Sequence, residues 1–264
     1  NRQWTKNGLI AYQESHDEER VFWETVNFGA TSPINLKSLE NAVNRNQLMT
    51  AFFLAIPGPK MIWQFGEFGY DLELNNDRLG IKPTRWEYLS NSDRLRLVQL
   101  YKEMFKLRAK YPVFNFPSNA SLNLGSAQKT IHLQHPDLQV FLFGNFDLVT
   151  QGNQSITFPK TGKWYNYFTG KELNVTSAQV SFGLRPNEFY LFTDKPLPLP
   201  EKDILQADFI TSIPEEVDEE GFVIYPNPTT SNVLVELPKE MTGAQYRVLD
   251  VTGRVIFEGK GSSA

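Results

Sequence analysis

The sequence predicts an α/β segment with two βα units, followed by all-β modules. In the first 110 residues, unbroken apolar runs alternate with segments whose apolar residues follow helical spacing. From about Val113, short β-rich runs separated by Gly, Asn and Pro take over, and a Pro-rich, acidic stretch then precedes a last group of such runs. The chain has 264 residues, more than the roughly 100–200 typical of one domain, so two or three domains are expected.

The first segment is expected to begin as strand, helix, strand. Apolar residues run without alternation over 9–12 and 61–65, which is typical of strands buried on both faces. Between them, Leu48, Ala51, Phe52 and Ala55 follow helical spacing, and Pro57-Gly58-Pro59 stops this helix. Each strand is thus followed by a helix.

A second helix completes the β-α-β-α order. Its apolar residues repeat at helical spacing over 97–105, with Ser92 as the expected N-cap and Pro112 as its end. Two βα units cannot make a stable α/β domain alone, because their strands need paired neighbours. We therefore interpret residues 1–112 as the last two units of a (β/α)₈ TIM barrel, a fold of about 250 residues. Roughly six units would then precede Asn1.

The remainder is expected to be β-structure interrupted by a linker. Residues 113–195 form an all-β domain, residues 196–221 a linker, and residues 222–264 a partial Ig-like β module. Strands of the first β domain are expected at 129–134, 138–146, 163–168 and 188–193. Those of the second are expected at 223–225, 233–235, 246–249 and 255–257, with Asp250–Gly253 as a hairpin turn.

Composition excludes several classes of function. With 26 Lys+Arg against 30 Asp+Glu, the net charge is −4, so the chain lacks the basic footprint of a nucleic-acid-binding protein. Its longest apolar stretch, 48–56, is about half of the roughly 18 residues of a membrane span. With no cysteine, disulfides, thiol nucleophiles and Cys-ligated zinc are excluded. Nothing near Asn1 has the pattern of a signal peptide, and we expect the chain to be a piece of a longer protein.

Polar residues that can carry chemistry follow the first predicted strand. The segment 14–20 reads Glu-Ser-His-Asp-Glu-Glu-Arg, at the strand end that faces the active site in barrel enzymes. A His beside an Asp suits acid/base work, metal ligation or hydrogen bonding to a polyol, and the alternative is a solvated acidic loop. The loop 70–80 also holds carboxylates, but without a recognisable ligand spacing, so no metal site is predicted there.

Two segments carry a resemblance to a known family. Tyr12–Asp17, with Arg20 three residues on, resembles the last of the four short motifs of the α-amylase superfamily, glycoside hydrolase family 13, at the end of the seventh barrel strand. Ile56–Gly69 resembles the eighth-strand segment of that family, where a Pro-Gly pair precedes the strand and Gly-x-Glu follows it. The resemblance covers about the first 195 residues and implies an antiparallel β-sandwich after the barrel.

The resemblance implies roles for four residues. Asp17 matches the third catalytic carboxylate, which stabilises the oxocarbenium-like transition state. His16 matches a histidine that hydrogen-bonds the same sugar, and Arg20 matches a basic residue common in this motif, with an ordinary surface arginine as the alternative. Glu67 follows the eighth strand and is expected to orient substrate or brace the site. Where many members have Asn before the His, this sequence has Ser15.

The resemblance implies that this chain is the C-terminal part of a secreted α-amylase-like glycoside hydrolase. The enzyme would act on α-1,4-glucans such as starch and maltodextrin by a retaining mechanism. The nucleophile and the general acid would lie upstream of Asn1, so this chain alone is expected to be inactive. No cofactor is expected in this segment, although the family implies calcium in the parent protein. The alternatives are a branching or transglycosylating enzyme and a non-catalytic glucan-binding surface protein.

The end of the chain carries a second resemblance. Tyr225–Thr230 and Tyr246–Val255 are similar to the C-terminal sorting domain of type IX secretion cargo. The resemblance implies the type IX secretion machinery as a partner and export to the cell surface or the medium. Only the first half of such a domain is present, and the alternative is an ordinary Ig-like module.

Overall fold

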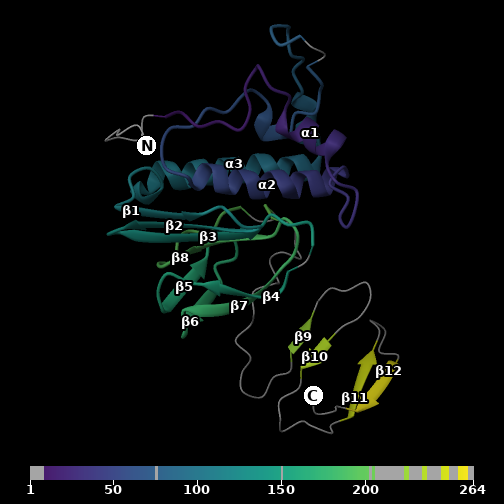
Figure 1. Cartoon of the computed structure of the whole chain (residues 1–264), viewed down its shortest axis with the longest axis vertical. Helices are drawn as coiled ribbons and strands as arrows, with labels where there is room; N and C mark the ends of the chain where they lie inside the picture. The colour runs from purple at the N-terminus through teal and green to yellow at the C-terminus, as the bar shows by residue number, and fades with distance from the viewer. Residues whose placement is uncertain are drawn as a thin grey trace. The chain divides into compact units, whose positions relative to one another are not determined.

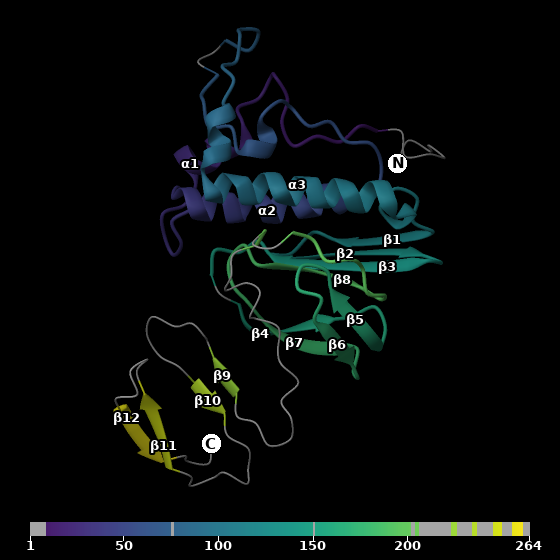
Figure 2. The same cartoon turned by 180° about the vertical axis from the view of Figure 1, so that it is seen from behind.

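The chain divides into two compact units, Asn1–Thr211 and Ser212–Ala264. The computed structural model describes residues 9–74, 77–149, 151–201, 204–205, 223–225, 234–236, 245–249 and 255–260. In the first unit, two long helices lie side by side across one face of an antiparallel sheet, as Figures 1 and 2 show from opposite sides. Within the described ranges, no helix is long and apolar enough to cross a membrane.

The helices exceed the expected ones in length and number. They are α1 (Val21–Phe28), α2 (Leu39–Ala55), α3 (Ser92–Lys110) and the 3₁₀ turns η1 (Gly66–Phe68), η2 (Trp86–Ser90) and η3 (Pro112–Phe114). The expected N-cap of α3, Ser92, is wrong by one residue. Asn91 has extended φ and ψ, and its side chain accepts a hydrogen bond from the backbone N of Arg94 at 3.0 Å. Asn91 therefore caps one of the free N–H groups at the helix start.

The two strands expected at 9–12 and 61–65 do not form as strands. The two segments are joined by one parallel β-bridge, between Ala11 and Lys60. The backbone N of Ala11 donates to Pro59 O at 3.1 Å, and that of Met61 donates to Ala11 O at 2.9 Å. In the described part of the chain neither segment has a second strand beside it, and an extended segment without paired neighbours makes few ladder bonds. The parallel direction agrees with the expected order of the two segments.

Lys60, at this bridge, makes stability depend on pH. Its ammonium donates to Gly58 O at 2.9 Å, and burial together with the charge of Arg108 lowers the pKa of Lys60 to about 8 from its ordinary value of 10.5. Between these two values the unfolded chain holds a proton that the folded chain has released. The free energy of unfolding is therefore expected to rise from about pH 8 to about pH 10. Denaturant titrations across this pH range should show that the free energy of unfolding rises less in Lys60→Met than in the wild type. An equal rise in both proteins would show that Lys60 is not the group responsible.

The β-domain of the first unit is built from two antiparallel sheets. The six-stranded sheet has the order β1-β2-β3-β8-β5-β6, and β4 pairs with β7 in the second sheet. The strands are β1 (Asn119–Asn123), β2 (Gln128–His135), β3 (Leu138–Asn145), β4 (Gln151–Thr157), β5 (Gly162–Asn166), β6 (Glu172–Val175), β7 (Gln179–Leu184) and β8 (Phe189–Thr193). The four expected strands correspond to β2, β3, β5 and β8. Of the other four, β1 and β4 have mostly polar sequences, which give no hydrophobic signal. The strands β6 and β7 do alternate apolar and polar residues, but this pattern was not recognised in the sequence.

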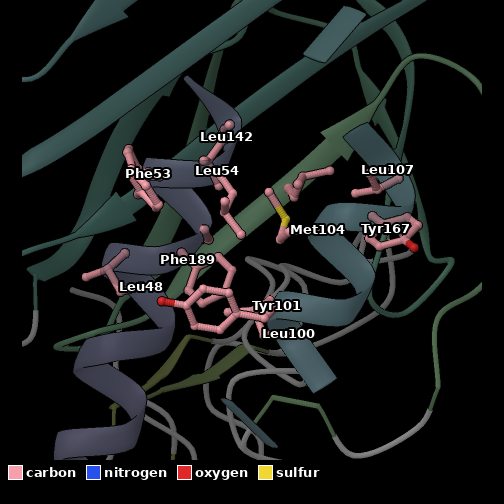
Figure 3. Close-up of a cluster of buried hydrophobic side chains, with 14 of the residues drawn as sticks. Leu48, Phe53, Leu54, Leu100, Tyr101, Met104, Leu107, Leu142, Tyr167 and Phe189 are labelled. Carbon is pink, nitrogen blue, oxygen red and sulfur yellow. The ribbon is translucent and has the colours of Figure 1, made fainter. Parts of the chain in front are cut away.

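The central strand β3 is apolar without alternation because both of its faces are buried. Val140 and Leu142 belong to the core that α2 and α3 share with the sheet, and Figure 3 shows Leu142 beside Leu54 of α2. Phe141 and Phe143 face the second sheet, where the Phe143 ring lies 5.0 Å from the ring of Phe182 on β7. An antiparallel strand between a helical layer and a second sheet thus has the same apolar pattern as a parallel barrel strand.

The segment after β8 returns to the helices. Ile204 and Leu205 are buried in the core of α2 and α3, and the Gln47 side-chain amide of α2 donates to Ile204 O at 2.7 Å. Lys102 of α3 also forms an ion pair with Glu201. The interpretation of residues 196–221 as a linker stays a prediction, and within this stretch Ile204 and Leu205 pack into the core of the first unit. Residues 206–222 lie outside the described part.

This burial predicts a stability effect for the segment. Ile204 is 2% exposed, so Ile204→Ala is expected to lower the free energy of unfolding by about 2–4 kcal/mol through lost burial and a residual cavity. Leu199 of the same segment is 62% exposed, and Leu199→Ala is expected to change it by less than about 0.5 kcal/mol. Denaturant titration of the two variants checks this prediction. A loss in Ile204→Ala as small as that in Leu199→Ala would show that Ile204 does not contribute to the core.

The described residues of the second unit form two antiparallel pairs. β9 (Val223–Tyr225) pairs with β10 (Leu234–Glu236), and β11 (Gln245–Leu249) pairs with β12 (Val255–Lys260). These four strands agree with the expected runs to within a few residues. The expected turn at 250–253 lies outside the described residues, and the Ig-like arrangement stays a prediction.

Candidate functional site

The loop 14–20 places His16 and Asp17 at its exposed tip. Their side chains are 47% and 56% exposed, and His16 Nε2 lies 3.4 Å from Asp17 Oδ1. The His16 ring also lies 5.7 Å from the indole of Trp63, at an interplanar angle of 43°. The structure thus brings two predicted site residues together on an accessible surface beside an aromatic ring. A carboxylate, an imidazole and an aromatic face are groups that hydrogen-bond and pack against a polyol.

Ser15 supports the tip from inside the loop. Its hydroxyl donates to Glu18 Oε2 and accepts a hydrogen bond from the backbone N of Asp17 at 3.2 Å. The bond from Ser15 also lowers the pKa of the Glu18 carboxyl. A serine therefore bonds the backbone of Asp17 where many members of the resembled family have an asparagine.

A buried ion pair closes the base of the loop. Arg20 is fully buried, and its Nη1 lies 3.0 Å from Glu14 Oε1, while Glu14 Oε2 accepts from the backbone N of Val21 at 2.9 Å. The guanidinium carbon lies 4.9 Å from the centre of the Tyr70 ring and 5.9 Å from that of Trp63. Burial raises the pKa of Glu14, although the charge of Arg20 opposes the shift. Arg20 is thus not a surface arginine, and its contact with substrate stays a prediction.

Glu67 lies on η1, near this ion pair rather than at the tip. Its Oε2 is buried and has no hydrogen-bond partner among the residues described. Burial raises the pKa of Glu67, while the charge of Arg20 lowers it, and Glu67 in turn raises the pKa of Glu14. The indole Nε1 of Trp63 is likewise buried and unpartnered in the described ranges. The role of Glu67 in substrate binding therefore stays a prediction.

A strained residue precedes Glu67. Phe65 has a φ of +60°, which lies in the left-handed region that residues other than Gly rarely adopt. Packing of its ring against Phe68 and Trp86 holds it there. At the next residue, Gly66, a Cβ would lie 2.4 Å from Glu14 Oε1. The glycine therefore lets the chain pass close to the buried carboxylate. The Gly-x-Glu pattern of the sequence marks this position, but the close approach to Glu14 was not predicted from it.

The first carboxylate of the loop 70–80 is engaged with the protein, and a carboxylate of the loop 14–20 binds the backbone of the same segment. Asp71 forms an ion pair with Arg94 at 2.5 Å and accepts a hydrogen bond from the Tyr88 hydroxyl. The two carboxylate oxygens of Glu19 each accept from the backbone N of Leu74 at 3.2 Å. Across the described ranges, no group of three or more His, Asp or Glu residues is arranged to hold a metal ion. The calcium implied for the parent protein stays a prediction.

The cavities do not coincide with the exposed tip. A cavity of about 10 Å³ lies beneath the loop and has Glu14, Trp63 and Gly66 among its lining residues, and it has room for about one water molecule. A larger cavity of about 200 Å³ lies in the β-domain, next to Tyr165, Tyr167 and Leu199. Neither of these two cavities is lined by His16, Asp17, Arg20 or Glu67.

Solved structures share this fold. An α-amylase from Anoxybacillus matches with a TM-score of 0.52 and 16% identity, over 73% of this chain and 39% of the amylase. The α-amylase from Geobacillus thermoleovorans, complexed with acarbose, matches with a TM-score of 0.54 and 14% identity, over 73% of this chain and 40% of the amylase. This chain thus spans about two fifths of the length of each amylase. Its first unit has an amylase-like fold.

The tail is identified by its sequence. Residues 223–263 match the family described as the Secretion system C-terminal sorting domain. The chain therefore combines a first unit with an amylase-like fold and a type IX sorting domain, and this domain indicates export to the cell surface or the medium. The resemblance to a sorting domain and the expected export are thus confirmed, and the resemblance to the amylase family is confirmed at the level of the fold. No curated protein sequence matches the chain.

Proposed function

We propose that the full-length protein is a secreted glycoside hydrolase that cleaves α-1,4-glucans by a retaining mechanism. The observation that carries the proposal is the exposed His16–Asp17 pair beside Trp63, on a fold shared with α-amylases. The sequence motifs around these residues support the same assignment. Residues 1–112 would be the last two units of a (β/α)₈ barrel, and the parallel bridge at Ala11 supports this placement.

The tip residues suit the stabilisation of a sugar rather than bond cleavage itself. The carboxylate of Asp17 would accept hydrogen bonds from sugar hydroxyls and favour the positive charge that develops on the ring in the transition state. His16 would donate to the same sugar, and Glu67 would orient a neighbouring group. A retaining mechanism needs two further carboxylates, a nucleophile and a general acid, which we place upstream of Asn1. The 264-residue chain alone is then inactive.

Product analysis with the full-length protein tests this function. We expect release of reducing ends from maltoheptaose and soluble starch, none from the β-1,4-linked cellohexaose, and none from the 264-residue chain on any substrate. Products longer than the substrate would indicate a branching or transglycosylating enzyme. Binding to insoluble starch without release of reducing ends would indicate a glucan-binding protein and would overturn the hydrolase assignment.

A further inference from the structure

We propose that Glu14 and Arg20 are positioning residues, whose buried ion pair holds the loop 14–20 so that Asp17 and His16 meet the substrate correctly. The inference rests on the proposed function for its catalytic consequence. It gives Arg20 a role that acts through the loop rather than through direct contact with a sugar. The pair was not predicted from the sequence, in which Glu14 received no role.

The first observation is that the pair joins the two ends of the loop. Glu14 and Arg20 are its first and last residues, and Nη1 of Arg20 lies 3.0 Å from Oε1 of Glu14. The other oxygen of Glu14 accepts from the backbone N of Val21, so both oxygens are used and the loop is tied to the start of α1. Because the two side chains are 10% and 0% exposed, water and salt compete little for this contact.

The second observation is that one aromatic ring contacts both the base and the tip. The Arg20 guanidinium lies 5.9 Å from the centre of the Trp63 ring, and the His16 ring lies 5.7 Å from the same indole. Trp63 is thus a neighbour of both the buried pair and the exposed pair. A displacement of Arg20 would move the surface against which His16 rests.

The third observation is that the guanidinium has few other partners. Its Nε and Nη2 are buried and form no hydrogen bond with any residue described. Glu14 forms the ion pair that holds Arg20, and removal of one member of a buried pair leaves the other uncompensated. The position of the loop base therefore depends on the carboxylate of Glu14.

Two variants disturb this pair in different ways. Glu14→Gln keeps the side-chain shape but leaves one acceptor oxygen where Arg20 and Val21 require two. Gly66→Ala keeps every charge and places a Cβ 2.4 Å from the original position of Glu14 Oε1, so the carboxylate must move. Glu103→Gln is the matched control, because Glu103 is a buried carboxylate on α3 that binds Lys106 and Tyr167, outside this loop.

Hydrogen exchange and steady-state kinetics of the full-length protein test the proposal. In Glu14→Gln and in Gly66→Ala, we expect amide exchange of peptides covering 14–21 to be about tenfold faster, with exchange in α2 and α3 unchanged. We also expect kcat on maltoheptaose to fall about 10- to 100-fold, with KM changed less than about threefold, since the tip acts mainly in the transition state. Glu103→Gln should leave both loop exchange and kcat as in the wild type.

Three outcomes would overturn the proposal. One is wild-type loop exchange in both variants, and another is faster loop exchange with an unchanged kcat. The third is a rise in exchange across α2 and α3 as large as in the loop, which would mark a purely structural role. A wild-type protein without activity on glucans would overturn the catalytic consequence together with the proposed function. Loop exchange would still decide whether the pair holds the loop.

Discussion

Replacing Asp17 with Asn in the full-length protein is expected to lower kcat on α-1,4-glucans by roughly 100- to 1,000-fold, the range observed when a transition-state-stabilising group is removed. The substitution removes the negative charge that would stabilise the sugar cation but keeps the size of the side chain. Because the Asp17 side chain is 56% exposed, its change leaves no buried group without a partner. The thermal unfolding midpoint should therefore stay that of the wild type.

The chain offers a matched control for this prediction. Asp137 also lies beside a histidine, with His135 Nδ1 3.5 Å from Asp137 Oδ2, and its side chain is 81% exposed. It belongs to the turn between β2 and β3, outside the loop 14–20. Asp137→Asn is expected to leave both turnover and stability unchanged. Turnover of Asp17→Asn close to that of wild type would contradict the role proposed for the tip.

Arg108→Met is expected to have the largest effect on stability, a loss of about 3–5 kcal/mol in the free energy of unfolding. Arg108 of α3 is 8% exposed, and burial lowers its pKa. Its guanidinium donates to five oxygens: those of Leu54 O at 2.6 Å, Ile56 O at 3.2 Å, Gly58 O at 2.6 Å, Phe114 O at 3.4 Å and Asn115 Oδ1 at 2.7 Å. A methionine fills the space but removes all five bonds, and among these acceptors Gly58 O keeps a bond from Lys60.

A neighbouring cation provides the control for this effect. Lys110 lies in the same last turn of α3 and is exposed, so Lys110→Met should change the free energy of unfolding by less than about 0.5 kcal/mol. Unfolding of the two variants in guanidinium chloride measures the difference between their free energies of unfolding. Similar midpoints for both would show that water replaces the bonds of Arg108.

The pattern of apolar residues predicted the helices and strands that bury one face or both faces. The spacing of apolar residues located α2 and α3, and the apolar runs located β2, β3, β5 and β8. The polar edge strand β1, Asn119–Asn123, is exposed at every position, so it forms through pairing with β2 and leaves no hydrophobic signal. The expected strands at 9–12 and 61–65 have no further paired neighbours among the described residues, and only one bridge joins them.

The sequence was less informative about the base of the candidate site than about its tip. His16 and Asp17 were found because they are adjacent and match a motif. The ion pair of Glu14 and Arg20 joins residues six positions apart across a loop, and its burial depends on Trp63 and Tyr70, which come from another segment. Hydrophobic periodicity does not report such long-range placement of polar groups.

The layer formed by α2 and α3 also determines how the first unit unfolds. Its core combines Leu48 and Met104 from the helices with Leu142 and Leu191 from the sheet, so the boundary drawn at residues 112/113 passes through one continuous apolar interior. Neither side can lose its structure without exposing the facing surface of the other. Melting of this unit should consequently be a single cooperative event, and proteolysis near 112/113 should release no stable half.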